Sequence, residues 1–244
     1  MAINREKFIS TLTSVFKDNG MGRLINKEKA EKFLILTEYM LEENEKYNLT
    51  AITDIDKIIL LHYLDCAMLS EKLKKGASVA DIGCGAGFPT LVLAILRDDL
   101  KITAIDSTAK RVDYVNRCAD ILGLSGVKAV TMRAEDGGKS PEYREKYDYA
   151  TARAVAEMRI LTELCMPYVK RGGEFLAMKG KNAEYELRDA KRAISLTGGK
   201  GARLETVTLK GSEEHSHPLI VVQKAEKTPD AYPRAFAQIS KKPL

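Results

Sequence analysis

Hydrophobic residues recur at helical spacing through about the first 75 residues of the chain. Apolar positions return every three to four residues over 8–16, 30–41 and 55–69, which is the period of a helix with one buried face. Asn26 and Thr53 stand directly before two of these stripes, where side chains that cap helices are favoured. Because no sustained strand-like alternation occurs here, we expect residues 1–75 to form a helical lobe.

From Ala77 onward, short runs rich in strand-forming residues alternate with segments of helical length. We expect strands over 78–82, 101–106, 127–133, 147–153 and 174–178, and helices over 89–97, 108–122, 157–169 and 183–196. This alternation predicts an α/β fold in which helices cover both faces of a parallel sheet.

The end of the chain breaks this rhythm. Runs over 202–209 and 219–224 read as two more strands, and the nine residues between them are too few for a crossover helix, so we expect an antiparallel hairpin. The tail from Thr228 holds three of the seven prolines, and we expect it to cross the surface without regular structure. The chain thus divides into a lobe at 1–75, a core at 76–225 and a tail at 226–244.

Composition places the 244 residues among ordinary globular proteins, with 45% hydrophobic and 30% charged side chains. Four cysteines lie far apart without a C-x-x-C pair, which favours reduced thiols in a cytoplasmic protein over a disulfide framework or a zinc ribbon. We expect neither secretion nor a membrane span, because the chain shows no signal-like apolar run at its start and no long apolar stretch.

The formal net charge is +5, and the whole excess lies within residues 76–244. A basic excess confined to one part of a chain fits a polyanionic partner. On this evidence alone, a mildly basic solvated surface explains the charge better.

A glycine-rich loop, Asp81–Pro89, follows the first predicted strand and precedes a helix. Its spacing over Gly83, Gly85 and Gly87 is G-x-G-x-G, whereas the dinucleotide fingerprint is G-x-G-x-x-G. Glycines at this place let the backbone turn tightly and let a ligand approach the main chain. Asp106 ends the second predicted strand, where a carboxylate can accept hydrogen bonds from ribose hydroxyls. Together the loop and the acid predict a cofactor that contains a nucleoside.

The glycine spacing and the terminal hairpin both argue against a hydride-transfer enzyme and are similar to the seven-stranded fold of S-adenosylmethionine-dependent methyltransferases. Further motifs then make the likeness specific. They are, in chain order, Asn48–Ile52, His62 with Asp65, the loop Asp81–Pro89, Asp106-Ser107, Lys110–Val112, Arg133–Glu135, Arg153–Ala156, Lys179-Gly180, Tyr232–Arg234 and Lys241–Leu244. Together these motifs resemble the RsmG (GidB) family, bacterial 16S ribosomal RNA methyltransferases that modify a guanine at N7, from about residue 45 to the end of the chain.

The resemblance implies a class I S-adenosylmethionine-dependent methyltransferase, with a Rossmann-like seven-stranded sheet, an antiparallel terminal hairpin and a helical N-terminal lobe. It implies S-adenosyl-L-methionine as donor and a guanine of the decoding region of 16S ribosomal RNA as acceptor, in free RNA or in the small ribosomal subunit. We expect a cytoplasmic monomer without metal or membrane contact. The residues expected at the donor are Gly83, Gly85, Gly87, Phe88, Asp106 (at the ribose), Ser107, Ala134, Glu135 and Arg153.

The sequence lacks the motifs of two other classes of methyltransferase, and methylation of guanine N7 needs neither of them. None of the cysteines follows the fourth predicted strand, where pyrimidine C5 methyltransferases hold a nucleophile, and Thr151–Ala154 stands where amino-group methyltransferases carry an Asn/Asp-Pro-Pro-aromatic turn. Guanine N7 has an in-plane lone pair and loses no proton, so positioning and exclusion of water suffice. Arg153 and Lys179, after the fourth and fifth predicted strands, are the candidate catalytic residues. Arg153 can bind the donor carboxylate or an RNA phosphate.

Residues 179–203 carry seven basic side chains against three acidic ones, which we interpret as a phosphate-contacting surface. We expect 215–217 to be a hairpin loop rather than a metal site, and His62 to be a packed or capping histidine. The chain departs from the usual family pattern at Cys66, at Thr90 and over 235–240, that is, at the start of the helix after the glycine loop and in the tail expected near the RNA. Two other functions stay open: a small-molecule methyltransferase, and a cofactor-sensing RNA-binding module without turnover.

Overall fold

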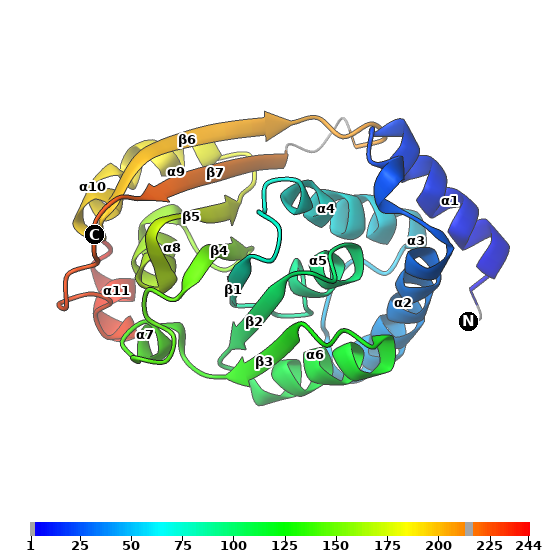
Figure 1. Cartoon of the computed structure of the whole chain (residues 1–244), viewed down its shortest axis with the longest axis horizontal. Coiled ribbons are helices and arrows are strands. Elements are labelled where there is room, and N and C mark those ends of the chain that lie inside the picture. Colours follow the sequence, from blue (N-terminus) through cyan, green and yellow to red (C-terminus); the bar gives the residue numbers. More distant parts are fainter. Residues whose placement is uncertain (1–2, 213–216) are drawn as a thin grey trace.

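A single mixed sheet forms the centre of the computed structural model, which describes residues 3–212 and 217–244 (Figure 1). Within these residues, the seven strands lie in the order β3-β2-β1-β4-β5-β7-β6. Their bounds are Ser78–Ile82 (β1), Lys101–Asp106 (β2), Val127–Thr131 (β3), Tyr147–Arg153 (β4), Val169–Met178 (β5), Gly199–Val207 (β6) and His217–Lys224 (β7). The chain order reverses between β1 and β4, and a sheet opens a crevice for ligands at such a point.

Strands β1 to β5 pair in parallel, and β7 runs antiparallel to both β5 and β6, so the predicted terminal hairpin is confirmed. The bounds predicted for β1, β2 and β4 are those observed. Strand β5 begins earlier than predicted, because Gly172 and Gly173 continue the strand instead of ending it. Gly173 is required there, since a Cβ atom on it would lie 2.3 Å from the carbonyl oxygen of Asp148 on β4.

Helices from the first half of the chain cover one face of the sheet. They are α1 (Arg5–Asp18), α2 (Lys27–Tyr47), α3 (Ile55–Ile58), a π-helical stretch (Ile59–Leu64), α4 (Asp65–Ser70), α5 (Thr90–Leu96) and α6 (Ala109–Leu122). Asn26 caps α2 as predicted, with its side chain 2.9 Å from the amide of Lys29. The cap of α3 is Asp54 rather than Thr53, because the Asp54 carboxylate reaches the amide of Lys57 at 3.0 Å.

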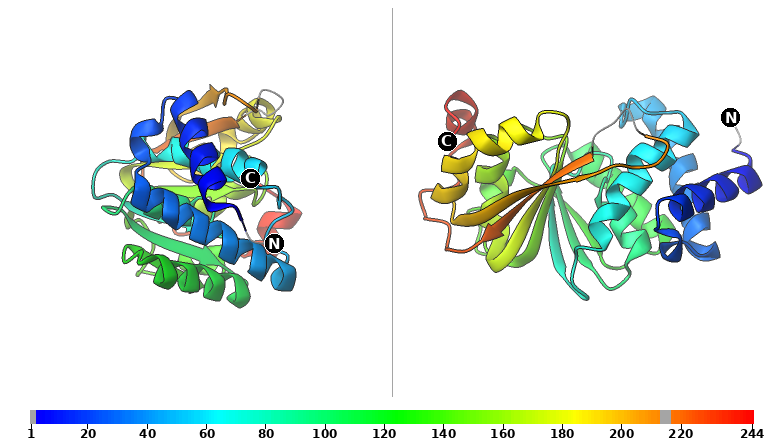
Figure 2. Two further views of the ribbon diagram at one scale, coloured as in Figure 1. Left: turned by 90° about the vertical axis from the view of Figure 1, so that its right-hand side faces the viewer. Right: turned by 90° about the horizontal axis from the view of Figure 1, so that it is seen from above.

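Helices from the second half of the chain cover the other face, as the right-hand view of Figure 2 shows. They are α7 (Ala134–Gly137), α8 (Met158–Cys165), α9 (Ala183–Asp189), α10 (Lys191–Leu196) and α11 (Phe236–Lys241). The helix predicted over 183–196 is two helices, because the backbone turns at Ala190.

The expectation of a tail without regular structure was wrong, because the tail contains α11 and buries Ile239 completely. An ion pair anchors this tail: Arg234 holds Glu163, which is fully buried on α8, through contacts of 2.7 and 2.9 Å. Arg159 of α8 also donates to the carbonyl oxygens of Pro243 and Leu244. Proline-rich composition hid this packing, since the tail shows no repeating apolar stripe.

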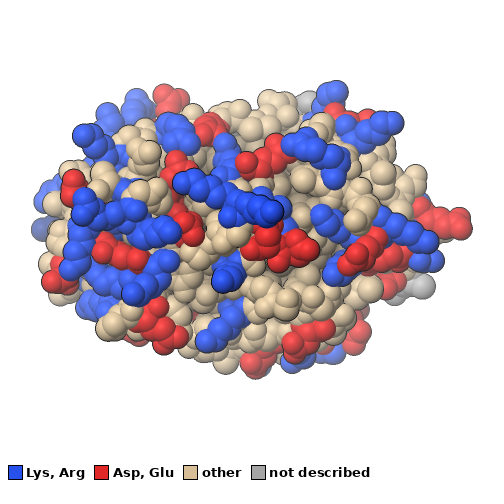
Figure 3. Space-filling model, viewed as in Figure 1, with Lys and Arg blue, Asp and Glu red and all other residues tan. Residues whose placement is uncertain are grey.

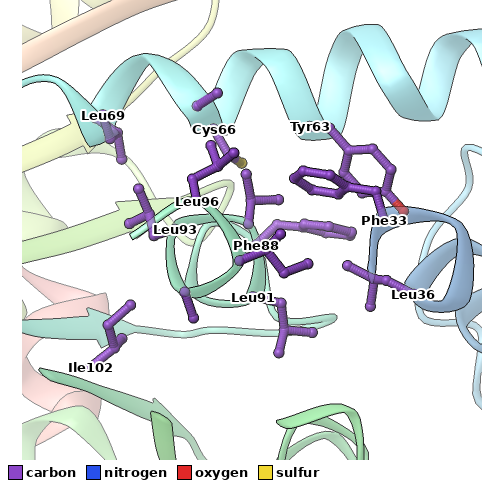
Figure 4. Packing of buried hydrophobic residues seen from close by; sticks show 14 of the residues in the cluster. Phe33, Leu36, Tyr63, Cys66, Leu69, Phe88, Leu91, Leu93, Leu96 and Ile102 are labelled. Carbon is purple, nitrogen blue, oxygen red and sulfur yellow. The ribbon is translucent and has the colours of Figure 1, made fainter. Parts of the chain in front are cut away.

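One hydrophobic core joins the N-terminal helices to the sheet. Helix α5 lies between the sheet and the helices α2 and α4, and Figure 4 shows Phe33 and Tyr63 of the lobe beside Phe88, which precedes α5. Phe33 and Tyr63 lie with ring centroids 4.6 Å apart, and the Tyr63 hydroxyl lies 2.7 Å from the Thr37 hydroxyl. The lobe is therefore fixed against the core, which sets the position of every side chain it directs toward the sheet.

All four cysteines are buried and free. Among the described residues, no helix combines the length and apolarity needed to cross a bilayer.

Candidate active site

The glycine loop after β1 forms the floor of the site. Gly83, Gly85 and Gly87 have φ angles of +75°, +53° and +83°, which side-chain-bearing residues rarely adopt. A Cβ atom on Gly83 would also lie 2.6 Å from Cγ2 of Val155. The amides of Gly83 and Cys84 both donate to the carbonyl oxygen of Ile105 on β2, at 2.7 and 3.1 Å. The loop is therefore held at the end of the neighbouring strand.

Asp106 at the end of β2 is held by the same loop. Its carboxylate accepts the amide of Gly85 at 3.0 Å and the amide of Thr108 at 2.9 Å, and Arg111 lies 3.7 Å away. Each carboxylate oxygen keeps a further lone pair. Asp106 is thus fixed in position and still able to accept hydrogen bonds from a ligand.

Asp81 at the end of β1 lies behind the loop and is buried. The hydroxyls of Thr90 and Thr151 donate to its carboxylate at 2.6 and 3.1 Å. Burial raises the pKa of Asp81 to about 6. Thr90, a departure from the family pattern, is therefore well placed: it begins α5 and satisfies a buried acid.

A cavity of about 450 Å³, here called the first cavity, opens above the loop. Most of the residues predicted at the donor line it, and these are Gly83, Gly85, Phe88, Asp106, Ser107, Ala134, Glu135 and Arg153. Gly87 does not line the first cavity. Its φ angle and the space that Leu91 fills beside it make it a turn and packing residue.

Arg153 at the end of β4 is clamped by the helical lobe. Its guanidinium donates to the carbonyl oxygen of Leu61 at 2.7 Å and lies 3.1 Å from Nδ1 of His62. Its Nε atom lies 3.3 Å from Asp65, and Nη1 lies 3.6 Å from the sulfur of Cys66. Four of its five N–H groups are therefore engaged within the protein, and it reaches the cavity as a fixed positive charge.

His62 lies between Arg153 and Phe88 and lines the first cavity. Its ring stacks on Phe88 with centroids 4.5 Å apart, and its Nε2 atom lies 3.0 Å from the hydroxyl of Thr50. Burial, and then the charge of Arg153, lower the pKa of His62 to about 4. The ring is therefore neutral near pH 7, with Nδ1 accepting from Arg153 and the proton on Nε2.

Two large ring side chains of this cavity, His62 and Phe236, were not predicted from the sequence to lie at the donor. His62 was expected to be a packed or capping histidine; it is packed against Phe88, and it also lines the site, because it lies on a π-helical stretch, a feature that occurs frequently at functional sites. Phe236 of the tail also lines the first cavity. Only His62 could have been found from the sequence, because it belongs to the motif that it forms with Asp65.

Lys179 lies in a second cavity of about 400 Å³, which shares Arg153 and Ala154 with the first. Its ammonium lies 2.7 Å from the carbonyl oxygen of Ala156 and 2.6 Å from Glu186, and the side chain is 8% exposed. Lys179 is therefore not part of an exposed phosphate-contacting surface. The other basic residues of 179–203 are exposed, namely Lys181, Arg188, Lys191, Arg192, Lys200 and Arg203.

His217 is the described part of the predicted hairpin loop at 215–217, and residues 215 and 216 lie outside the described residues. It begins β7 instead of lying in the loop, and it contacts Asp65 at 2.8 Å and Ser212 at 3.1 Å. Asp65 therefore joins His217 on one side to Arg153 on the other.

Comparison with solved structures shows the same fold. A methyltransferase from Aquifex aeolicus, described as dependent on S-adenosylmethionine, superposes with a TM-score of 0.53 at 19% identity, covering 75% of this chain and 97% of that chain. A geranyl diphosphate methyltransferase solved with S-adenosylmethionine gives a TM-score of 0.53 at 15% identity, covering 67% and 85%.

Sequence relatives are much closer. The ribosomal RNA small subunit methyltransferase G of Clostridium perfringens strain 13 is 43% identical over 228 residues, covering 93% of this chain and 95% of the relative. The protein of the same name from Lactobacillus acidophilus is 42% identical over 246 residues, covering 99% and 100%.

The sheet order, the glycine loop and these structural likenesses define a class I S-adenosylmethionine-dependent methyltransferase fold. The profile of the GidB family, described as rRNA small subunit methyltransferase G, matches residues 29–217. With relatives above 40% identity along nearly its whole length, the chain belongs to this family.

Proposed function

We propose that this chain transfers a methyl group from S-adenosyl-L-methionine to N7 of a guanine in 16S ribosomal RNA, in the decoding region of the small subunit. One observation carries the proposal: the glycine loop, Asp106 and Arg153 line a single cavity in a chain that belongs to the rRNA small subunit methyltransferase G family. We further propose that the protein is cytoplasmic, that it acts as a monomer, and that its substrate is free RNA or the small ribosomal subunit.

The residues of the first cavity suit the donor. Gly85 leaves room for a ligand to approach the main chain, because only the carbonyl oxygen of Gly83 lies within 4 Å of the position that its Cβ atom would take. Asp106 can accept the hydroxyls of a ribose. Ser107 follows Asp106, and Ala134 and Glu135 begin α7 on the same cavity, where an adenine would lie. Arg153 supplies the positive charge for a carboxylate.

The bound donor would supply a methyl group made electrophilic by a positively charged sulfur. The lone pair of guanine N7 forms the new bond to carbon as the bond to sulfur breaks, and the electrons of that bond stay on sulfur. The positive charge passes to the base and no proton is released. The protein therefore needs to orient the two reactants and keep water out.

The three parts of the proposed division contribute differently to this task. The lobe (1–75) supplies His62, the core (76–225) supplies Asp106 and Arg153, and the tail (226–244) supplies Phe236. His62 and Phe88 form a stacked pair beside Arg153, and this pair would fix the methyl-bearing end of the donor.

The direct test is mass spectrometry of 16S ribosomal RNA from a strain that lacks the gene. We expect one 7-methylguanosine to be lost and to return when the wild-type gene is restored. An unchanged content of 7-methylguanosine in the deletion strain would defeat the proposal.

Two measurements separate the alternatives. Binding to small-subunit RNA that weakens steeply with salt argues against a small-molecule methyltransferase. Transfer of a labelled methyl group under single-turnover conditions argues against a binding module without turnover.

A further inference from the structure

The second cavity adjoins the first at the place where methyl transfer would occur. Arg153 and Ala154 line both cavities, and Val155 lies over Gly83 of the glycine loop. Ala154 has a φ angle of +55°, and residues held in such conformations cluster at ligand sites. A molecule in the second cavity would therefore lie against the end of the donor that carries the methyl group.

The walls of the second cavity suit a flat ring. Ile52 and Met68 come from the lobe, while Met178 and Pro218 come from the ends of β5 and β7. The volume of about 400 Å³ exceeds what a purine needs and leaves room for its sugar.

The charged groups of the second cavity are largely paired with one another. Glu186 accepts the ammonium of Lys179 and the amide of Met158, at 2.6 and 2.8 Å. Asp65 is held between Arg153 and His217. Lys179 has three N–H groups, and its two contacts, with Ala156 and Glu186, leave one for a ligand.

We propose that the second cavity takes the acceptor guanine and that Lys179 selects it by donating a hydrogen bond to O6. This inference rests on the proposed function. Guanine carries its O6 and N7 acceptors on one edge, whereas adenine presents an amino group in place of O6. The buried ammonium of Lys179 attracts O6 and repels that amino group, so the edge that Lys179 reads in guanine is also the edge that is methylated.

The first experiment measures base selectivity without turnover. The full chain is saturated with S-adenosylhomocysteine, so that the first cavity is filled, and is titrated with guanosine 5′-monophosphate or adenosine 5′-monophosphate. We expect the wild type to bind the guanine nucleotide about tenfold more tightly, the order of one hydrogen bond to a charged group. Lys179→Met should abolish this preference, whereas Lys181→Met, which removes an exposed neighbouring charge, should keep it.

The second experiment fills the cavity. Ile52 lines it and Thr53 beside it is exposed, so Ile52→Trp and Thr53→Trp form a matched pair. Methyl transfer to small ribosomal subunits should fall at least about tenfold in Ile52→Trp alone. Both variants should bind S-adenosylhomocysteine like the wild type, which shows that they are folded.

The outcomes separate this inference from the proposed function. A Lys179→Met protein that still prefers the guanine nucleotide, or an Ile52→Trp protein that transfers methyl groups at the rate of Thr53→Trp, overturns the inference. Absence of 7-methylguanosine formation by the wild type would overturn the proposed function instead, and the nucleotide titration does not depend on it.

Discussion

Three ionisable side chains end three neighbouring strands, and their surroundings give them different tasks. Asp81 on β1 lies behind the glycine loop, where two hydroxyls satisfy it, so its role is structural. Asp106 on β2 lies on the cavity side of the loop and keeps free lone pairs for a ligand. Arg153 on β4 is immobilised by the lobe. Residue type and burial do not distinguish the two acids, because both are buried; only Asp106 lines the first cavity.

Replacing Asp106 by alanine should weaken donor binding more than RNA binding. The loss of a carboxylate that accepts ribose hydroxyls should lower the affinity for S-adenosylhomocysteine by about tenfold or more, the scale of hydrogen bonds to a charged group. Calorimetry measures this affinity, and Asp113→Ala, which removes an exposed acid on α6, is the control. Equal donor affinity in Asp106→Ala and the wild type would refute the assignment.

His62 should make the folded chain sensitive to mild acid. Its pKa is lowered from 6.5 to about 4, so below pH 6.5 the unfolded chain binds the proton more readily and the stability contributed by the neutral ring is lost toward pH 4. The loss amounts to about 3 kcal/mol for a shift of this size. Denaturant unfolding between pH 4 and 7 should show a smaller loss of stability in His62→Gln, which cannot titrate.

Asp81 acts with the opposite sign, because its raised pKa favours the folded state as pH falls from about 6. The difference between wild type and His62→Gln isolates the histidine from this second group. An identical pH dependence in the two proteins would contradict the burial of a neutral ring.

At the scale of elements, the site is built from segments far apart in the chain. The β1 loop and the end of β2 form its floor, the π-helical stretch closes one side, and α11 contributes Phe236. The tail is held there by the pair of Arg234 with buried Glu163. The C-terminal segment is thus part of the first cavity.

Phe236→Ala should weaken donor binding about threefold to tenfold, because the aromatic wall that α11 contributes to the first cavity would be lost. The thermal stability should change little, since Phe236 is 40% exposed. Titration with S-adenosylhomocysteine measures the effect, and Gln238→Ala on the same helix is the matched control. If both variants bind alike, α11 is only a packing element.

Much of this arrangement could be predicted from the sequence, for physical reasons that also explain the failures. Strands β1, β2 and β4 are buried apolar runs bounded by turn residues, and the glycine loop and Asp106 are local signals at their ends. The role of His62 depends on a π-helical stretch, which no periodicity marks. Phe236 reaches the cavity because contacts between distant parts of the chain hold the tail in place, among them the ion pair of Arg234 with Glu163 and the burial of Ile239.

At the scale of the whole molecule, basic side chains are spread unevenly. Figure 3 shows Lys and Arg interspersed with acids on one face, with a denser basic group over the end that carries α8 to α11. The exposed members of 179–203, including Lys181, Arg188 and Lys191, belong to the second half of the chain, where the whole net charge lies. A polyanion would therefore meet more positive charge there than on the lobe.

The affinity for small-subunit RNA should depend on salt through these residues. Replacing Lys181, Arg188 and Lys191 by glutamine should reduce the slope of log affinity against log salt by about two to three, one counterion for each lost phosphate contact. The control is a second triple variant, in which the exposed lobe residues Lys17, Lys27 and Lys57 are replaced by glutamine. Equal slopes in the two triple variants would contradict a phosphate-contacting role for 179–203.

The reactivity of the buried Cys84 thiol can report on motion of the glycine loop, in which this residue lies. Burial raises the pKa of this thiol well above its usual value, and only the thiolate reacts readily with alkylating reagents. Labelling of Cys84 therefore has to wait until the loop opens, and a molecule lodged against the loop would delay that opening. The rate of thiol labelling would then measure how often the glycine loop opens, without a labelled ligand in the first cavity.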